Sequence, residues 1–115
     1  MANSAEAVVV AALAGIGVKV YPDVAPSGAE RPYVTYQAVG GQDVNDLSGP
    51  ADLENQRMQI NVWSATRAAT VATMRSARAA LVAAGALPIG APVSDSEQDT
   101  QLYGSRLDFS IWFKP

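Results

Sequence analysis

The sequence contains no cysteine and no histidine among its 115 residues. A chain without cysteine cannot form disulfides, use a thiolate nucleophile or build a cysteine zinc site. A chain without histidine lacks the side chain that most often acts as a general base or ligates a metal. These two absences weaken most enzyme hypotheses, so we predict no catalytic residue, no metal site and no cofactor.

Charge of either sign is also scarce. Charged residues make up 17% of the chain, and the net charge is -3 at pH 7. Proteins that bind nucleic acid through its phosphates carry a basic surface, so this balance argues against that class of function. The 49% share of hydrophobic residues is typical of a globular protein. We predict one domain, residues 1 to 115, with a single core.

The longest apolar run lies near the N-terminus, from Ala5 to Val18. It contains Glu6, follows no basic segment and lacks a convincing cleavage site, which argues against a signal peptide. It is also shorter than the roughly 20 apolar residues that a membrane span needs. We therefore expect a soluble cytoplasmic product without membrane contact.

Two helices are predicted. The first follows a cap at Asn3 or Ser4 and ends at Gly15. The second runs from about Ala65 to Ala84 and is closed by a glycine and a proline. Both are rich in alanine, so they can pack closely against a sheet.

Strands are predicted over residues 18 to 22, 32 to 41 and 53 to 64, and at the end of the chain from residue 106. The first two are separated by a loop rich in proline, glycine and charge. The fold class is therefore α+β, with one mostly antiparallel sheet and two helices packed on one face.

Two long connections are predicted as loops, residues 40 to 52 and 88 to 105. Both are rich in glycine, proline and acidic side chains, which favour turns. The first separates two strand patterns and is interpreted as the extended tip of a hairpin. We expect residues 41 to 52 and 89 to 101 to be mobile in the free protein and to become ordered against a partner.

Two of the strands read almost alike: "RMQINVW" at 57 to 63 and "RLDFSIW" at 106 to 112. Their alternation predicts strands that bury one face beneath the second helix. The residues expected on that buried face are Met58, Ile60, Val62, Leu107, Phe109 and Ile111. The other face is unusual because it carries both tryptophans of the chain. Its residues are Arg57, Gln59, Asn61, Trp63, Arg106, Asp108, Ser110 and Trp112.

The tryptophan-bearing face has two interpretations. Trp and Arg are enriched at interface hot spots, which favours a contact between subunits. The residues proposed for that interface are Arg57, Gln59, Asn61, Trp63, Arg106, Asp108 and Trp112. Alternatively, both tryptophans lie beneath a loop or helix of the same subunit, and Arg57 pairs with Asp108 across neighbouring strands.

The second predicted helix has distinct sides on a helical wheel. One side gathers the residues expected in the core, Thr70, Met74, Ala77 and Leu81. Another gathers a stripe beside Val71 and Val82 that consists of Arg67, Arg75 and Arg78. The stripe is either a solvated face or a contact for an acidic partner surface, and we include it in the proposed interface.

Acidic residues gather in or beside the two predicted loops. Those interpreted as partner contacts are Asp43, Asp46, Asp52, Asp95, Glu97 and Asp99. Their separation from the arginine stripe would let copies of the molecule attract one another head to tail. Chance is the alternative explanation.

Two ligand or catalytic motifs fail on inspection. Residues 43 to 54 place acid or amide groups at three positions of a calcium loop, but Ser48 stands where that loop requires glycine. Serines and threonines are plentiful, yet a catalytic triad would have no histidine base.

Three short pieces of sequence, together with the order of the predicted elements, carry a resemblance to a known family. These are P-Y-V at 32 to 34, R-x-Q-I-x-V-W at 57 to 63 joined directly to an alanine-rich helix, and D-F-S-I-W at 108 to 112. With these pieces, nearly the whole chain resembles the tail-completion or tail-terminator proteins of long-tailed bacteriophages. None of the pieces is a catalytic motif, so the resemblance transfers no enzyme site.

The resemblance implies a small α+β protein that forms a ring, usually a hexamer, at the head-proximal end of the tail tube. There it would stop tube polymerisation and provide the head-tail joint. The implied partners are further copies of the chain, the tail tube protein and the head-tail connector (neck) protein, while genomic DNA passes through the bore without specific binding. The implied location is the virion tail, with the host cytoplasm during assembly.

Two other functions stay open at this point. A head-closure or connector (neck) component of the same particle would use a similar small fold. A small-ligand module or enzyme would need a pocket with converging polar groups, which the sequence does not indicate.

Overall fold

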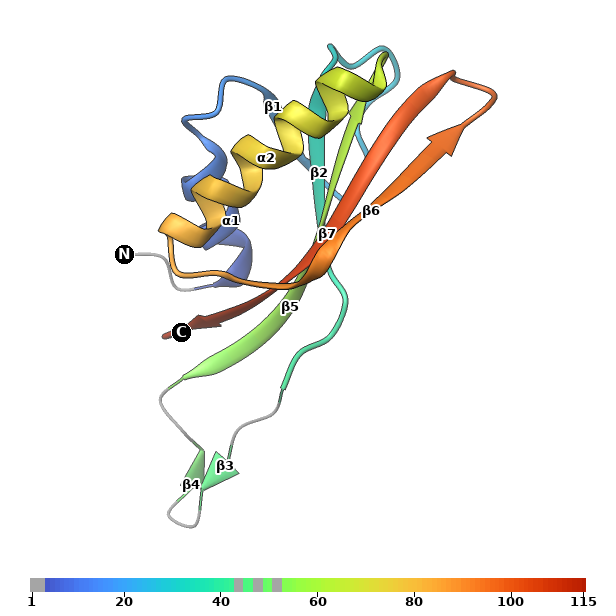
Figure 1. Ribbon diagram of the computed structural model, residues 1–115. Helices are drawn as coiled ribbons and strands as arrows, with labels where there is room; N and C mark the ends of the chain where they lie inside the picture. Colours follow the sequence, from blue (N-terminus) through green and yellow to red (C-terminus); the bar gives the residue numbers. More distant parts are fainter. Residues whose placement is uncertain (1–3, 43–44, 47–48, 51–52) are drawn as a thin grey trace.

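The computed structural model describes residues 4–42, 45–46, 49–50 and 53–115. Within these residues, two helices lie on one face of a five-stranded sheet (Figure 1). The elements follow in the order α1 (Ala5–Leu13), β1 (Lys19–Pro22), β2 (Tyr33–Ala38), β3 (Asn45–Asp46), β4 (Gly49–Pro50), β5 (Glu54–Ser64), α2 (Arg67–Ala83), β6 (Leu87–Glu97) and β7 (Leu102–Phe113).

The sheet has the strand order β1-β2-β5-β7-β6. Only β1 and β2 run parallel, while β2 with β5, β5 with β7 and β6 with β7 are antiparallel. The predicted α+β class with one mostly antiparallel sheet is therefore confirmed. β2 and β5 also form the predicted hairpin, and β3 and β4 form a small antiparallel pair of their own within its connection.

The two similar sequences lie side by side at the centre of the sheet, in β5 and β7. Met58 lies opposite Phe109, and Ile60 lies opposite Leu107. Because side chains alternate along a strand, these residues share one face. All six residues predicted for the buried face are buried, which confirms the prediction.

Both helices pack on that same face. α1 buries Ala5, Val9 and Leu13, and these join one core cluster with the strand residues. α2 buries the four residues predicted from its wheel, Thr70, Met74, Ala77 and Leu81. The position of two helices on one side of the sheet is thereby confirmed.

Side-chain caps fix where the helices begin. The Ser4 hydroxyl accepts a hydrogen bond from the Ala7 N–H at 3.0 Å, and the Thr66 hydroxyl accepts one from the Ala69 N–H at 3.1 Å. Such caps satisfy N–H groups that have no partner within the helix. After α2, Gly85 adopts φ +95°, a conformation that glycine takes without steric cost.

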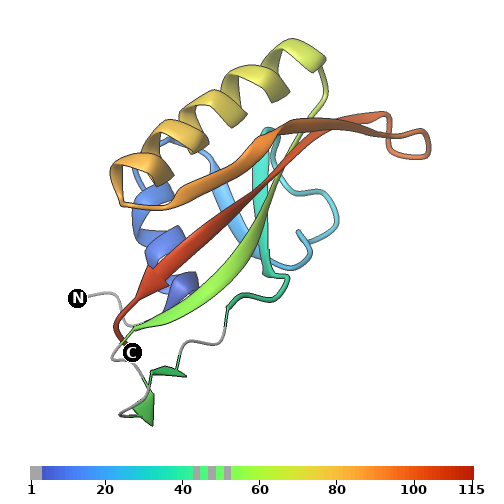
Figure 2. The same cartoon turned by 60° about the horizontal axis from the view of Figure 1, so that its bottom comes forward.

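The predicted loop over 88 to 105 is wrong. Residues 87–97 form the edge strand β6, a turn follows at 98–101, and β7 begins at Leu102 instead of residue 106. Two prolines and Gly90 indicated a loop, but an edge strand tolerates them because one side of its backbone has no ladder partner. The register also shifts between Ile89 and Val93, which accommodates the irregular stretch. The result is an arm that projects from the body of the molecule (Figure 2).

One buried hydroxyl ties α2 to the sheet and offers a test of this packing. Thr70 is fully buried, and its Oγ1 lies 2.9 Å from both the Thr66 and the Tyr103 carbonyl oxygens. Thr70→Val keeps the volume but removes the donor, so we expect the free energy of unfolding to fall by about 1 to 2 kcal/mol. Urea denaturation measures the change.

Thr73→Val is the matched control, because the Thr73 side chain is only half-buried and makes no hydrogen bond within the described part of the chain. It should change stability by less than about 0.5 kcal/mol. Equal effects of the two substitutions would contradict the assigned role of Thr70.

Candidate interaction surface

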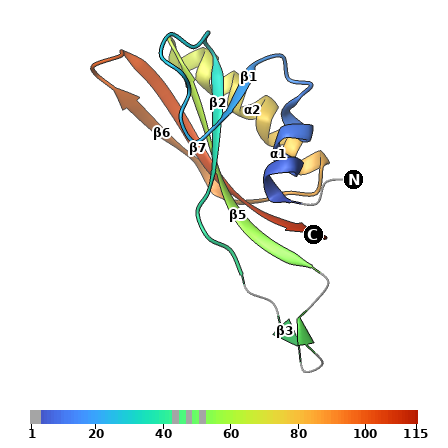
Figure 3. The same cartoon turned by 180° about the vertical axis from the view of Figure 1, so that it is seen from behind.

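The sheet face opposite the helices has no helix on it within the described residues (Figure 3). We call it the outer face. Strand alternation and register place the following residues on it: Lys19, Tyr21, Tyr33, Thr35, Gln37, Asn55, Arg57, Gln59, Asn61, Trp63, Leu87, Ile89, Val93, Asp95, Glu97, Leu102, Gly104, Arg106, Asp108, Ser110 and Trp112. All seven strand residues predicted for a subunit interface are among them.

The middle of the outer face is polar and largely paired within the subunit. Arg57 Nε donates to Asp108 Oδ2 at 2.7 Å, and Asn55 Nδ2 donates to Ser110 Oγ at 2.8 Å. The Arg57 and Asp108 pairing that the alternative interpretation predicted is therefore present. Because the pair is partly exposed, it contributes about 1 kcal/mol or less to stability.

Two further outer-face contacts are looser. Asn61 Nδ2 donates to Gln59 Oε1 at 3.3 Å, and Arg106 lies 3.9 Å from the Asp95 carboxylate. These side chains retain hydrogen-bonding capacity that a partner can use, because an arginine carries five donors.

The two tryptophans lie at opposite ends of the outer face. Trp63 is opposite Gly104, whereas Trp112 is opposite Asn55. Asn55 and Trp63 are eight positions apart on β5, which corresponds to about 26 Å along a strand. The repeated sequence thus produces two separate aromatic positions, and the structure does not bring them together.

Trp63 packs within its own subunit. A Cβ atom added at Gly104 would lie only 2.8 Å from Trp63 Cζ3, so the ring lies directly over this glycine. Tyr33 is the neighbour of Trp63 on the other side, and its ring stands edge-on to Tyr21 at 6.1 Å. Burial raises the pKa of Tyr33, and the Glu97 carboxylate raises it further. This end of the face is thus an aromatic cluster of Tyr21, Tyr33 and Trp63.

The other part of the outer face leaves apolar side chains exposed to solvent. Trp112 is 38% exposed, and three apolar residues of β6 are more exposed still. We call these four residues the apolar border: Leu87, Ile89, Val93 and Trp112. A shallow hollow of about 280 Å³ lies beside Ile89 and Val93, where the β6 register shifts. Exposed apolar residues gathered on one surface are typical of contacts with another protein.

The arginines of α2 divide into two groups. Arg67 Nη1 donates to the Gly104 carbonyl at 2.6 Å, Nη2 donates to the Asp95 carbonyl at 2.9 Å, and the guanidinium lies 5.4 Å from the centre of the Tyr103 ring. Arg75 and Arg78 are exposed instead. The predicted stripe is thus real along the helix, but its first member holds the arm of its own subunit.

The predicted acidic positions lie in two places. Asp95, Glu97 and Asp99 are exposed at the end of the β6–β7 arm. Asp43 and Asp52 lie outside the described residues, and Asp46 lies in β3, where only the backbone is described.

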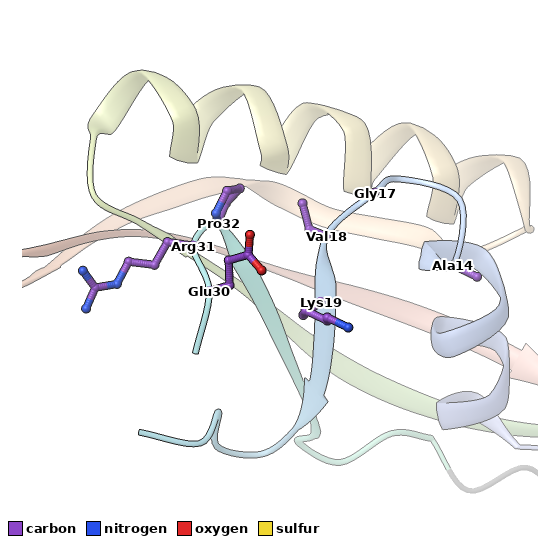
Figure 4. Close-up of a pocket in the computed structure, with 7 residues that line it drawn as sticks. All are labelled: Ala14, Gly17, Val18, Lys19, Glu30, Arg31 and Pro32. Carbon is purple, nitrogen blue, oxygen red and sulfur yellow. The ribbon is translucent and has the colours of Figure 1, made fainter. Parts of the chain in front are cut away.

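A hollow of about 380 Å³ lies between the end of α1 and the segment before β2. Its charged residues are Lys19, Glu30 and Arg31, and the charged ends of Lys19 and Arg31 point in opposite directions (Figure 4). The hollow therefore does not bring polar groups together as a catalytic pocket does.

Among residues 4–42, 45–46, 49–50 and 53–115, no three acidic side chains are placed to hold a metal ion. Across the same residues, neither helix is both long and apolar enough to cross a bilayer.

Comparison with known proteins identifies the family of the chain. The chain belongs to the family described as tail completion protein gp17, which matches residues 3–114. A chain from the virion of a native gene transfer agent (GTA) particle is similar in structure, with a TM-score of 0.57 and 21% sequence identity, covering 96% of this chain and 87% of that one. No curated protein sequence matches. By its family, the protein is a structural protein of the phage tail.

The positions of the tryptophans predict different effects of their removal. Trp63→Ala should lower the free energy of unfolding by about 2 to 3 kcal/mol, because the ring is packed over Gly104 and half-buried. Trp112→Ala should lower it by less than about 1 kcal/mol, because the side chain is exposed. Urea unfolding of both variants measures the difference, and equal losses would contradict this placement.

Proposed function

We propose that this tail completion protein forms a ring, of six copies, at the head-proximal end of the tail tube. The ring ends tube polymerisation and provides the surface that joins the head. The observation that carries this proposal is the family match over residues 3–114, which spans nearly the whole chain. A protein that completes a tail acts at the end of the tube, and a closed ring is the symmetric way to cover that end.

The surfaces of the subunit support this assembly. The apolar border lies on the outer face, along β6 and at the end of β7, while Arg75 and Arg78 lie on the helix layer. Contacts between two different surfaces of identical subunits are head to tail, and such contacts close into rings when the rotation allows it. We assign the apolar border and the polar side chains beside it to contacts with neighbouring subunits or with the tube.

The proposed partners follow from the position at the tail end. The ring contacts further copies of the chain, the tail tube protein on one side and the connector (neck) protein on the other. Genomic DNA passes through the bore, and the net charge of -3 keeps the duplex from adhering to it. Assembly takes place in the host cytoplasm before the particle is complete.

Tail tubes mixed with the purified protein test the proposal. In negative-stain images we expect a ring at one end of each tube, and tubes capped in this way should not lengthen when tube protein is added. If the protein does not bind tubes but binds isolated connectors, its role is that of a head-closure or connector component instead.

Trp112→Ala tests whether the apolar border takes part in capping. Removal of an interface aromatic typically costs about 2 kcal/mol or more of binding free energy, so we expect at least about tenfold more protein to be needed for half-maximal capping. Val24→Ala is the control, because Val24 is an exposed apolar residue in the loop after β1. Equal capping by the two variants would exclude Trp112 from the contact.

A further inference from the structure

The exposed arginines of α2 stand in a defined line along the helix. Val71, Arg75, Arg78 and Val82 follow one another at spacings of four, three and four residues, which places them on one strip of the helix surface. Val71 and Val82 are 41% and 43% exposed, and both arginines are exposed. We call these four residues the arginine strip. It is apolar at both ends and cationic in the middle.

No charge within α2 opposes this strip. The helix contains three arginines and no acidic residue. The two ion pairs within the described residues involve Arg57 and Arg106 and not the strip. The strip therefore presents two positive charges to whatever covers it.

The complementary surface is the end of the β6–β7 arm. Asp95, Glu97 and Asp99 are exposed there, in and beside the turn at 98–101. The arm is also held in a fixed direction, because Arg67 donates to the backbone carbonyls of Asp95 and Gly104, one on each of its strands. An anchored arm presents its acidic end without a further loss of chain entropy on binding.

The arm cannot reach the strip of its own subunit. Arg67 lies at the start of α2, and Arg75 and Arg78 lie about 12 and 16 Å farther toward its C-terminal end. The arm projects the opposite way, beyond the N-terminal end of α2 (Figures 1 and 2). An acidic end and a basic strip that cannot meet within one molecule are placed to meet between two.

We propose that the arginine strip of α2 binds the acidic end of the β6–β7 arm of a second copy of this chain. The inference rests on the proposed ring and names the contact that closes it. Because the two surfaces differ, the contact is head to tail and can repeat from subunit to subunit. Complementary charge also fixes its register and speeds encounter between copies.

Charge reversal tests the contact on the full chain. Arg75→Glu with Arg78→Glu makes the strip acidic, and Glu97→Lys with Asp99→Lys makes the arm basic. At low salt, each double variant alone should self-associate at least about tenfold more weakly than the wild type in sedimentation velocity, because like charges then meet. An equimolar mixture of the two should recover assembly, since every strip then has an arm of opposite charge to bind. The variant that carries all four changes should assemble by itself.

Lys19→Glu with Arg31→Glu is the control for net charge, because both residues are exposed and lie at the β1 side of the molecule. It should assemble like the wild type. Thermal unfolding of each variant shows whether it is folded before its assembly is judged.

Three outcomes would overturn the inference. The first is wild-type assembly by both double variants, and the second is a mixture of folded variants that fails to recover. The third is a wild-type chain that stays monomeric at low salt. Loss of duplex DNA binding by the strip variant with unchanged self-association would assign the strip to nucleic acid instead. A different outcome would contradict the proposed function: rings that form through this contact but do not cap tubes.

Discussion

The antiparallel pairing of β5 with β7 is the constraint on which the other features depend. It sets Met58 opposite Phe109 and Ile60 opposite Leu107, so that one face of the sheet is apolar and both helices pack on it to form the core. A slip of one residue would turn these side chains outward. The same pairing separates the two tryptophans by the length of the shared strand region, because similar sequences run in opposite directions. The pairing of β5 with β7 therefore produces the core, and it also places the packed Trp63 and the exposed Trp112 at opposite ends of the outer face.

The surfaces left after folding differ in chemistry and position. The centre of the outer face satisfies much of its own hydrogen bonding, as the Arg57 and Asp108 pair shows. The apolar border stays exposed, and within the described residues neither the arginine strip nor Glu97 and Asp99 at the end of the arm forms an ion pair. A structural protein of a phage tail works by contacts of this kind. For that reason we propose that these three surfaces, and not a hollow, carry its function.

Sequence patterns predicted the parts of the fold that bury side chains periodically. Alternation identified β5, and the wheel of α2 identified its four buried residues. β6 was not predicted as a strand for two reasons. Nearly all its side chains are exposed, so it shows no alternation of buried and exposed residues, and its prolines favour a loop. The arginine stripe was found, but the wheel could not show that Arg67 reaches the arm. A helical wheel describes one helix and not its neighbours. Gly104 was the available signal for Trp63, since a glycine within a strand often marks the close approach of another group.

We propose that copies of this chain close into a ring at the end of a tail tube. Electron cryo-microscopy of capped tubes measures this directly, because the map shows both the number of subunits and the surfaces between them. We expect a closed ring of six copies in which the β6–β7 arm of each subunit lies on α2 of the next. A cap of two-fold pairs joined through the same surface of each subunit, or tube ends without this protein, would contradict it.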